Sequence, residues 1–552
     1  MAQITNRTSA LSRRLLLQSA AAVALSSGLS GPTRAQAKRY RRPNIGSSAG
    51  KKSLASYRKA IAAMLALPPS DARNWYRLAI AHALDCPHGN WWFLPWHRGF
   101  LGWFEQICRE LSGDAEFALP FWDWTAEPRI PADMFEGVLT PSDSAYFDRF
   151  SDFKEQFAQA VASLDCWKVV TKSDGTFDYA SPYAQLLTRG FRTPADLWFD
   201  MFEDPRGKLF FDLAHARGPT RLQPDLDDNA KKAVSLPTLL DALAPKDFLS
   251  FASPKALQHG TMAGFGILEG QPHNNVHRCI GGISSPPYGG GFMQANLSPV
   301  DPIFWLHHAN IDRIWDVWER KQKGQNLPSL PDGAPAEPGD KPLPGSDYAQ
   351  WAGEPFLFFT DAHGAPARKT TCGDYAEIGE FNYDYEPGSG DEVVSMAAAP
   401  ASPAGVRTFL AEILTSAVNM ARPARATVSM PHALLGETSS PSRFFARITV
   451  AFKGPMHAVP LRLSVGRDVG PSANAPGFAG MLTMFGHHTM QGPVTFLVPL
   501  SAPMRTMQAG RASRAEGLLP LTIAMGDAAG HIEGHSDSEA GAEILAVAVE
   551  MH

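Results

Sequence analysis

The chain has 552 residues, 44% of them hydrophobic and 19% charged, a composition that predicts two or three folded domains and excludes a disordered protein. The formal net charge of -5 argues against nucleic acid and anionic membranes as partners. The cysteine count of 5 is odd, so we expect no disulfide framework.

The first 37 residues have the features of an export signal. A pair of arginines lies in the run Ser12–Leu17, which resembles a twin-arginine signal. The apolar stretch Leu15–Leu29 is too short to span a bilayer, and Ala35–Ala37 offers small residues for cleavage. The alternative is a basic start to an ordinary helix. We expect an exported protein, periplasmic or extracellular, and no membrane span further along the chain.

Three helices are predicted in the region that carries the first group of histidines. Apolar residues recur at helical spacing over Ser53–Leu67, and the two prolines that follow end this helix. A second helix is expected to run to about Leu84, and a third over His97–Leu111. His82 then lies near the end of the second helix, and His88 lies on the loop between the two. These three imidazoles could converge on one metal ion and leave a coordination position open.

The second group of histidines lies in a later pair of predicted helices. His273 and His277 are four residues apart, which places both rings on one face of a helix. We expect this helix to begin near Pro272. The helix expected over residues 303–323 offers His307 and His308 as a third ligand. His308 lies on the same helical stripe as Ile311, Asp312 and Trp315, which should face the core. We therefore expect His308 to point inward and His307 to point to the side.

Six imidazoles in two groups of three predict two metal ions side by side. The lack of a carboxylate ligand in either group disfavours magnesium, manganese and a di-iron site, and favours copper. Two cuprous ions could each give one electron to dioxygen. A pair of zinc ions, in a hydrolase or a metal-storage protein, is the alternative from another class.

The remainder of the chain divides into loops, a linker and a region rich in strands. Residues 128–255 read as loops and short helices, and Leu327–Ser346 as a surface loop. Ala397–Gly405 has the composition of a linker. Beyond it, apolar runs separated by turns predict a small antiparallel sandwich or barrel, with strands over Arg443–Phe452, Leu461–Val465, Val494–Leu500, Leu519–Met525 and Ile544–Glu550.

Two stretches resemble the copper-binding signatures of tyrosinases, or polyphenol oxidases, in a bacterial, exported form. The first is carried by His88, Phe93, Leu94, Trp96, His97, Arg98, Leu101 and Glu105. The second is carried by Asp301, Pro302, Phe304, Trp305, His308 and Asp312. The aromatic stretch Pro120–Trp124, which we expect to cover the site, the His273/His277 pair and the motif Tyr383-x-Tyr385 extend the likeness over residues 50–390.

The resemblance implies a mainly α fold with a four-helix-bundle dicopper catalytic domain and long loops over residues 38–390. We expect a linker over 391–405 and a small all-β, sandwich-like C-terminal domain over 406–552. The implied cofactor is two copper ions. The implied activity is the oxidation of monophenols and o-diphenols to o-quinones with dioxygen. The alternatives are a catechol oxidase or o-aminophenol oxidase without strong monophenolase activity, and a hemocyanin-like oxygen carrier.

The same resemblance implies roles for individual residues. It makes His308, rather than His307, the last of six copper ligands, the others being His82, His88, His97, His273 and His277. It implies a thioether bond between Cys86 and His88, although the six-residue gap from His82 to His88 is shorter than in many members.

Four more residues are expected to bear on the substrate. Glu269 and Asn274 match the acid and the amide that hold a water molecule, and an ionised carboxylate there could take a phenol's proton. Arg278 would guide or repel substrate carboxylates, and the small Ala295 would leave the entrance open. The ordinary alternatives are an acid at a helix start, a surface amide and an ion-pair partner.

The C-terminal region contains sulfur and imidazole groups that suit cuprous copper, namely Met481, Met484, His487, His488 and Met490. The edge of a strand is the alternative interpretation of this run. We further hypothesise that residues from about 406 onward shield the dicopper site, which would make a latent form.

Overall fold

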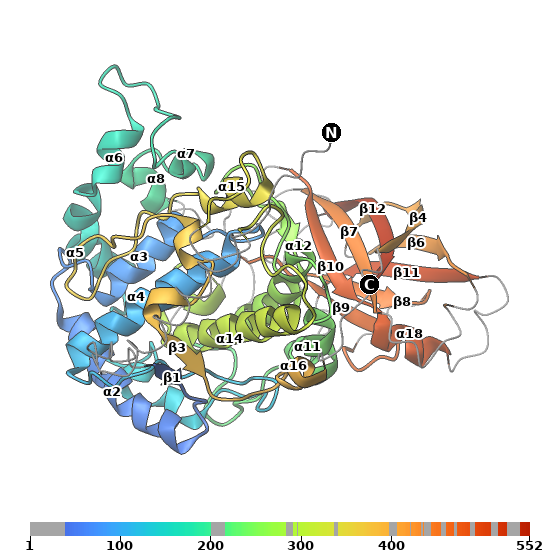
Figure 1. The fold of residues 1–552 in the computed structure, drawn as a ribbon, viewed down its shortest axis with the longest axis horizontal. Helices are drawn as coiled ribbons and strands as arrows, with labels where there is room; N and C mark the ends of the chain where they lie inside the picture. Colours follow the sequence, from blue (N-terminus) through green and yellow to red (C-terminus); the bar gives the residue numbers. More distant parts are fainter. Residues whose placement is uncertain are drawn as a thin grey trace, which may run out of the picture. The chain divides into compact units, whose positions relative to one another are not determined.

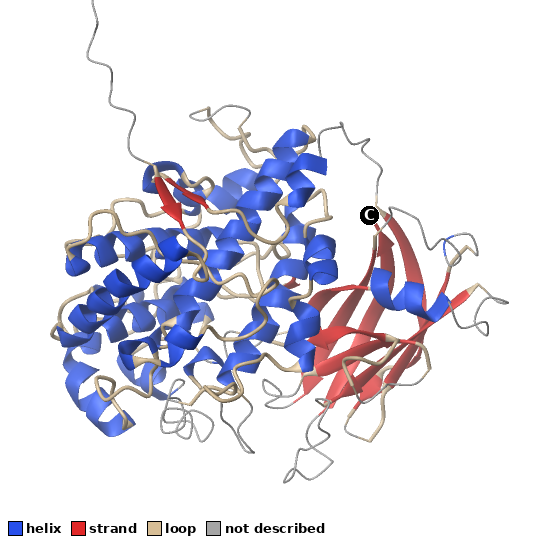
Figure 2. Ribbon diagram, turned by 90° about the horizontal axis from the view of Figure 1, so that it is seen from below, coloured by secondary structure: helices blue, strands red, loops and turns tan. Residues whose placement is uncertain are grey.

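The computed structural model describes residues 39–199, 216–282, 291–294, 296–335, 340–396, 406–419, 421–431, 434, 443–453, 460–467, 472–485, 492–508, 517–526 and 541–552. The expected export signal and the linker Ala397–Gly405 therefore lie outside the described residues. Tyr40–His552 forms one compact unit, in which helices gather in one region and strands in another (Figures 1 and 2). No helix in the described part of the chain has both the length and the apolar character that crossing a membrane requires.

Five helices form the frame of the helical region: α2 (Ser48–Ala66), α3 (Trp75–Asp85), α4 (Phe93–Ser112), α13 (Asn274–Gly281) and α14 (Ile303–Gly324). The Ser47 hydroxyl caps α2 by accepting the Gly50 N–H, and the Asn74 side chain caps α3 in the same way. Gly113, in the left-handed conformation with φ 70°, ends α4. α2 packs on α3 and α4, and α4 packs on α14.

Most of the predicted helices are confirmed, with two differences at their starts. α4 begins at Phe93 rather than at His97, so that Pro95 lies inside its first turn. Proline is tolerated there because the first turn of a helix has no intrahelical acceptors for its N–H groups. Pro272 lies within a π-helical turn, η4 (Glu269–His273), which leads directly into α13.

Shorter helices connect these elements, as expected for residues 128–255. They are η1 (Ala132–Phe135), η2 (Gly137–Leu139), α5 (Phe150–Ala162), α6 (Asp165–Val170), α7 (Gln185–Thr188), α8 (Pro194–Trp198), α10 (Asp228–Ala233), α11 (Leu236–Ala242), α12 (Phe248–Phe251), η5 (Phe292–Gln294), η6 (Ser298–Val300), α15 (Asp347–Ala352), η7 (Cys372–Tyr375), η8 (Gly379–Phe381) and α16 (Glu392–Met396).

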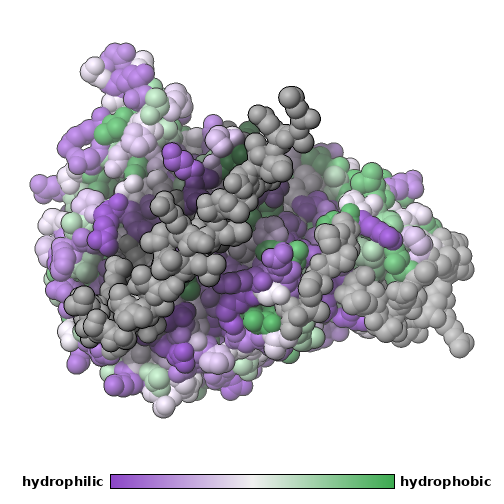
Figure 3. All heavy atoms as spheres, in the orientation of Figure 1, coloured by the Kyte–Doolittle hydropathy of each residue, from purple (hydrophilic) through white to green (hydrophobic). Residues whose placement is uncertain are grey.

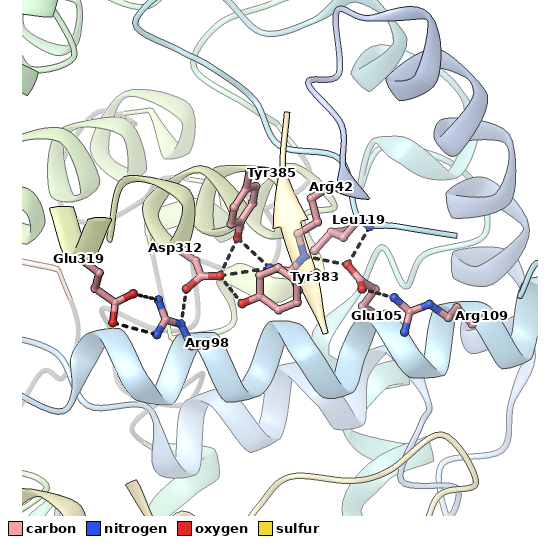
Figure 4. Close-up of polar contacts among 9 residues, drawn as sticks. All are labelled: Arg42, Arg98, Glu105, Arg109, Leu119, Asp312, Glu319, Tyr383 and Tyr385. Carbon is pink, nitrogen blue, oxygen red and sulfur yellow. Dashed lines mark hydrogen bonds and ion pairs between the residues drawn. The ribbon is translucent and has the colours of Figure 1, made fainter. Parts of the chain in front are cut away.

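A buried network of charged and hydroxyl groups connects α14 with α4 and with two short strands near the ends of the helical region (Figure 4). Asp312 on α14 accepts from Arg98 at 2.7 Å and from Arg42 at 3.2 Å. It also accepts the hydroxyl groups of Tyr383 and Tyr385, the two tyrosines of the predicted motif. Arg42 and the tyrosines lie on β1 (Tyr40–Arg42) and β3 (Tyr383–Tyr385), which pair in parallel.

The charged side chains of this network are buried, so they are stabilised by one another and not by water. Although burial opposes the charged form, Arg98 and Arg42 lower the pKa of Asp312. Removing one member of such a network leaves the others uncompensated, at a cost of about 3–5 kcal/mol. Asp312 lies one helical turn after His308, so the network fixes α14 where it carries the second group of histidines.

The C-terminal region is β-rich, as expected. Its strands are β4 (Arg407–Thr415), β5 (Ala417–Val418), β6 (Ala424–Ser429), β7 (Phe444–Lys453), β8 (Leu461–Val465), β9 (Phe478–Leu482), β10 (Val494–Pro499), β11 (Leu518–Met525) and β12 (Gly541–Met551), with the helix α18 (Ser501–Gln508) after β10. Together with β2 (Gly264–Phe265), they form one curled ten-stranded sheet in the order β2-β10-β7-β12-β4-β6-β11-β8-β9, with β5 paired to β12. The strands thus belong to one curled sheet, where the sequence led us to expect a small antiparallel sandwich or barrel.

One strand of this sheet comes from the helical region. β2 (Gly264–Phe265) pairs in parallel with β10, and the Phe265 side chain lies in the apolar core of the sheet. The outer face of the sheet exposes apolar side chains on β4 and β12, visible in Figure 3, among them Leu410, Leu414 and Leu545. The sheet is therefore joined to the helical region by main-chain hydrogen bonds a few residues before Glu269.

Candidate metal centre

Eight buried side chains form two clusters that could each hold a metal ion. The first contains His82 from the last turns of α3, His97 from α4, and Cys86 and His88 from the loop between them. The second contains His273, His277, His307 and His308. Within each cluster the potential ligand atoms lie within 4.8 Å of one another. The structure thus brings together all six histidines that the sequence singled out.

The two clusters face each other. The rings of His97 and His308 are stacked with their centroids 4.1 Å apart, and those of His88 and His273 are 5.7 Å apart. Two histidines of each cluster therefore lie against histidines of the other, as a shared two-metal site requires.

Hydrogen bonds fix the protonation of four of these rings. The Nδ1 atoms of His82, His97 and His277 lie 2.6, 2.8 and 2.5 Å from backbone carbonyl oxygens, and Nδ1 of His273 lies 2.9 Å from the Asn274 side-chain oxygen. A carbonyl oxygen can only accept, so in each neutral ring Nδ1 carries the proton and Nε2 keeps its lone pair. This outer contact is the one that metal-binding histidines commonly make.

The freed nitrogens fit a cation. Nε2 of His82 and Nε2 of His273 are buried without a hydrogen-bond partner. Nε2 of His277 lies 3.1 Å from Nε2 of His308. Buried polar atoms without partners are costly, and a metal ion between these lone pairs would remove that cost.

A hydrogen bond from a tryptophan distinguishes His307 from His308 as a possible metal ligand. The indole N–H of Trp124 donates to Nδ1 of His307 at 3.2 Å. In a neutral ring this places the His307 proton on Nε2, which then has no lone pair for a metal. The arrangement favours His308 as the third ligand. It also gives the aromatic stretch Pro120–Trp124 a contact with the edge of the centre.

Burial keeps the rings neutral, the form that binds metal. It lowers the pKa of His97 to about 3. It also lowers the pKa of His82, His273, His277 and His308 well below the ordinary value, with further lowering from neighbouring imidazoles.

Cys86 lies among the potential ligands of the first cluster. Its Sγ is 3.6 Å from Nδ1 and 3.7 Å from Nε2 of His88, and 3.4 Å from Nε2 of His97. Burial raises the pKa of the thiol well above its ordinary value. The sulfur is thus in contact with the His88 ring, with the thiol as the favoured form.

Glu269 and Asn274 lie beside the second cluster, but both are engaged. The Glu269 carboxyl accepts the Gly89 N–H at 2.8 Å and the Ser253 hydroxyl. Asn274 accepts from His273 and donates its amide to the Thr483 carbonyl of the C-terminal region at 2.8 Å. Burial raises the pKa of Glu269 to about 8, which differs from the ionised carboxylate expected from the sequence. Cations in the two clusters would oppose this shift.

Three other expectations concerned Arg278, Ala295 and the Met/His run. Arg278 is only 7% exposed and makes two 2.7 Å contacts with Asp227, as in the ion-pair alternative. Ala295 lies outside the described residues. Of the Met/His run, Met481 is buried on β9 and Met484 packs against the core of the sheet, while His487, His488 and Met490 lie outside the described residues.

One residue at the centre was not anticipated. The Phe485 ring lies 3.8 Å from the His277 ring, 4.8 Å from that of His88 and 5.4 Å from that of His273. It is 4% exposed, and it follows β9 in the C-terminal region. The Met/His run drew attention to this stretch of the sequence. A phenylalanine in it gives no indication, however, that its ring contacts histidines far away in the chain.

Comparisons with known proteins find several similar chains. A family model described as the common central domain of tyrosinase matches residues 59–321. A (+)-larreatricin hydroxylase of Larrea tridentata is 28% identical over 283 residues, covering 48% of this chain and 38% of that protein. The latent form of a polyphenol oxidase of Prunus armeniaca is 26% identical over 351 residues, covering 60% and 46%. A tyrosinase of Hahella sp. (strain CCB-MM4) is 27% identical over 250 residues, covering 44% and 39%. The chain spans less than half the length of these curated relatives.

Solved structures share the fold. A latent aurone synthase (polyphenol oxidase) has a TM-score of 0.55 at 17% identity, covering 94% of this chain and 90% of that chain. A latent apple tyrosinase has a TM-score of 0.51 at 18% identity, covering 93% and 97%. The comparisons support the tyrosinase and polyphenol oxidase family. Tyrosinases hold a pair of copper ions, and the two histidine groups of this chain can hold two metal ions.

Proposed function

We propose that this protein oxidises monophenols and o-diphenols to o-quinones with dioxygen. The six ligands of the two copper ions would be His82, His88, His97, His273, His277 and His308. The observation that carries the proposal is the pair of facing imidazole groups, in which Nε2 of His82 and Nε2 of His273 are buried without a hydrogen-bond partner. When bound, the two copper ions supply the redox chemistry that reduces dioxygen.

The residues around the centre would hold the ligands and exclude water. Backbone carbonyls orient His82, His97 and His277 through Nδ1, so that each ring presents Nε2. A thioether bond between Cys86 and His88 would fix the one ligand that lies on a loop, and their contact at 3.6 Å supports this.

Hydroxylation of a monophenol needs a group that takes the phenol's proton, because a phenol with a pKa near 10 stays neutral at physiological pH. Glu269 and Asn274 are the residues we assign to this task, through a water molecule held between them. Asn274 can take part only when its amide is released from the Thr483 carbonyl. Monophenolase activity therefore requires the C-terminal region to move away from Asn274.

The C-terminal region would shield the centre. Phe485 fills the space against three of the proposed ligand rings, which supports a latent form of the enzyme. Arg278 and Ala295 remain proposed substrate-binding residues, and Arg278 would first have to exchange its contact with Asp227. Export by the twin-arginine route stays a prediction.

Copper analysis and a substrate panel test the proposal. The protein, loaded with cuprous copper and purified, should hold two copper ions per chain and oxidise catechol and tyrosine in air. Fewer than two copper ions in fully loaded protein, or no turnover of any phenol by the chain cut within 397–405, would refute it. Oxidation of catechol or 2-aminophenol without tyrosine would identify a catechol oxidase or an o-aminophenol oxidase. Reversible oxygen binding without turnover would identify a carrier.

A further inference from the structure

The loop that carries Cys86 and His88 has no regular structure, yet it is fully buried. Residues 86–90 form neither helix nor strand, and each is shielded from solvent. Loops usually lie on the surface, because their backbone polar groups need partners. The position of this loop, and with it the distance from Cys86 to His88, must therefore come from contacts with another part of the chain.

Residues 259–264 supply contacts of this kind. The Gly89 carbonyl accepts from the Gly264 N–H at 2.9 Å and from the N–H before it at 2.8 Å. The Asn90 amide donates to the His259 carbonyl at 3.0 Å. The Gly89–Asn90 end of the loop is therefore held by hydrogen bonds to residues 259–264, whereas at the Asp85 end the Cys86 N–H donates to the His82 carbonyl of α3 at 3.0 Å.

A side chain, the ring of His259, makes a second contact at the Asp85 end. Its Nε2 lies 2.5 Å from the Asp85 carbonyl, and its Nδ1 lies 3.1 Å from the Glu354 carboxylate. The ring is 2% exposed and stacks on Trp92, with the centroids 5.9 Å apart. A ring between two acceptors can satisfy both only when both nitrogens carry protons.

The charged groups around the His259 ring favour this doubly protonated form. Although burial opposes the charged form, the hydrogen bond from the His259 ring to the Glu354 carboxylate and the charge of Asp85 raise the pKa of His259 above its ordinary value. The Asp85 carboxylate in turn accepts from the indole of Trp96 at 2.8 Å, next to His97 on α4. His259 thus connects the start of the loop to Glu354 on one side and, through Asp85, to α4 on the other.

We propose that His259 is a positioning residue that sets the Asp85 end of the loop, so that Cys86 meets the His88 ring for cross-linking. This inference rests on the thioether and the copper centre of the proposed function. His259 would act through the Asp85 carbonyl, which is one peptide bond from Cys86. Geometry at a reacting pair is sensitive to displacements of about 1 Å, so loss of this contact should slow the cross-link strongly.

The cross-linking step itself balances with dioxygen as the oxidant. A bond forms between the Cys86 sulfur and a ring carbon of His88, while the S–H bond and one ring C–H bond break. The two electrons and two protons released reduce dioxygen to hydrogen peroxide. The product therefore lacks two hydrogen atoms relative to the separate side chains, which mass spectrometry detects.

Two near-isosteric variants separate the contacts of the ring. In His259→Gln the amide nitrogen can occupy the place of Nε2 and keep the bond to the Asp85 carbonyl. In His259→Asn it can occupy the place of Nδ1 and keep only the Glu354 contact. Tyr146→Phe is the control, because it removes one buried hydrogen bond, to the Val138 carbonyl, from another loop of the helical region.

The full chains are loaded with copper in air, and the cross-linked fraction of the peptide containing Cys86 and His88 is measured. We expect His259→Asn to lower the rate of cross-linking about tenfold, and His259→Gln and Tyr146→Phe to stay within about twofold of the unchanged chain. His259→Phe, which keeps the ring shape and loses both bonds, provides a second measurement of the same loss.

Cross-linking of His259→Asn and His259→Phe at the unchanged rate would overturn the proposal. So would an unchanged chain that forms no cross-link at all. In that case catechol oxidation by the same sample would show that the proposed oxidase function stands without the thioether.

Discussion

Truncation of Phe485 is the most direct test of shielding by the C-terminal region. The ring is 4% exposed, and it packs against His277, His88 and His273 with centroids 3.8, 4.8 and 5.4 Å away. In Phe485→Ala the closed arrangement loses this packing, whereas the open arrangement loses nothing comparable. The equilibrium between them should therefore shift towards the open form.

The burial of the phenyl ring gives the size of this shift. Burying a phenylalanine side chain contributes about 2–3 kcal/mol, and each 1.4 kcal/mol changes an equilibrium tenfold. The open population of Phe485→Ala should rise roughly 30- to 150-fold when it is small in the unchanged chain. Because substrate reaches the centre only in the open form, kcat/KM for catechol should rise by the same factor, until the open form dominates.

Steady-state oxidation of catechol by copper-loaded full-length chains measures this factor. Met484→Ala is the matched control, since Met484 is the preceding residue and packs against the core of the sheet. Its kcat/KM should stay within about twofold of the unchanged chain. If Phe485→Ala retains two copper ions and shows the kcat/KM of the unchanged chain, Phe485 does not obstruct the centre, and the shielding argument is wrong.

Three further predictions follow from the fold. Asp312→Asn should lower the free energy of unfolding by denaturant by about 3–5 kcal/mol, whereas Asp384→Asn, in an exposed ion pair, should cost about 1 kcal/mol or less. The pKa of Asp241 is raised from 3.8 to about 6, mainly by burial, so the unfolded chain loses this proton first. The stability of the unchanged chain relative to Asp241→Asn should therefore fall by about 3 kcal/mol as the pH rises from about 4 to 6; a flat difference would contradict the shift. In Gly264→Ala the new Cβ would lie 2.3 Å from a carbonyl of β10, so amide exchange in β2 should speed up, whereas Gly379→Ala, with open space around it, should leave it unchanged.

The histidine groups could be predicted from the sequence because helical spacing is local information. The four-residue interval between His273 and His277 fixes their relative direction, and the stripe through His308 points it inward. The contact that favours His308 most strongly, from Trp124 to His307, joins residues 183 positions apart. The spacing of residues along one helix carries no information about such a contact.

The strands that the sequence did not reveal have weak or inverted apolar patterns. β6 turns small residues such as Ala424 and Ala426 inward, which gives little hydrophobic contrast along the strand. β4 exposes Leu410 and Leu414 on its outer face, so its larger apolar residues do not mark the buried side. The two-residue β2 owes its conformation to its partner strand β10, since a strand so short has no stability of its own.

The pairing of β2 with β10 connects the C-terminal region to the loop that carries His88. From β10 the main-chain hydrogen bonds continue through Gly264 to the Gly89 carbonyl, one residue from His88. The Gly89 N–H in turn binds the Glu269 carboxyl at 2.8 Å. Separation of the sheet from the helical region would break the first link of this series and loosen the support of both His88 and Glu269. Release of Phe485 alone would leave the series intact, so opening the entrance and detaching the whole region should affect copper binding differently.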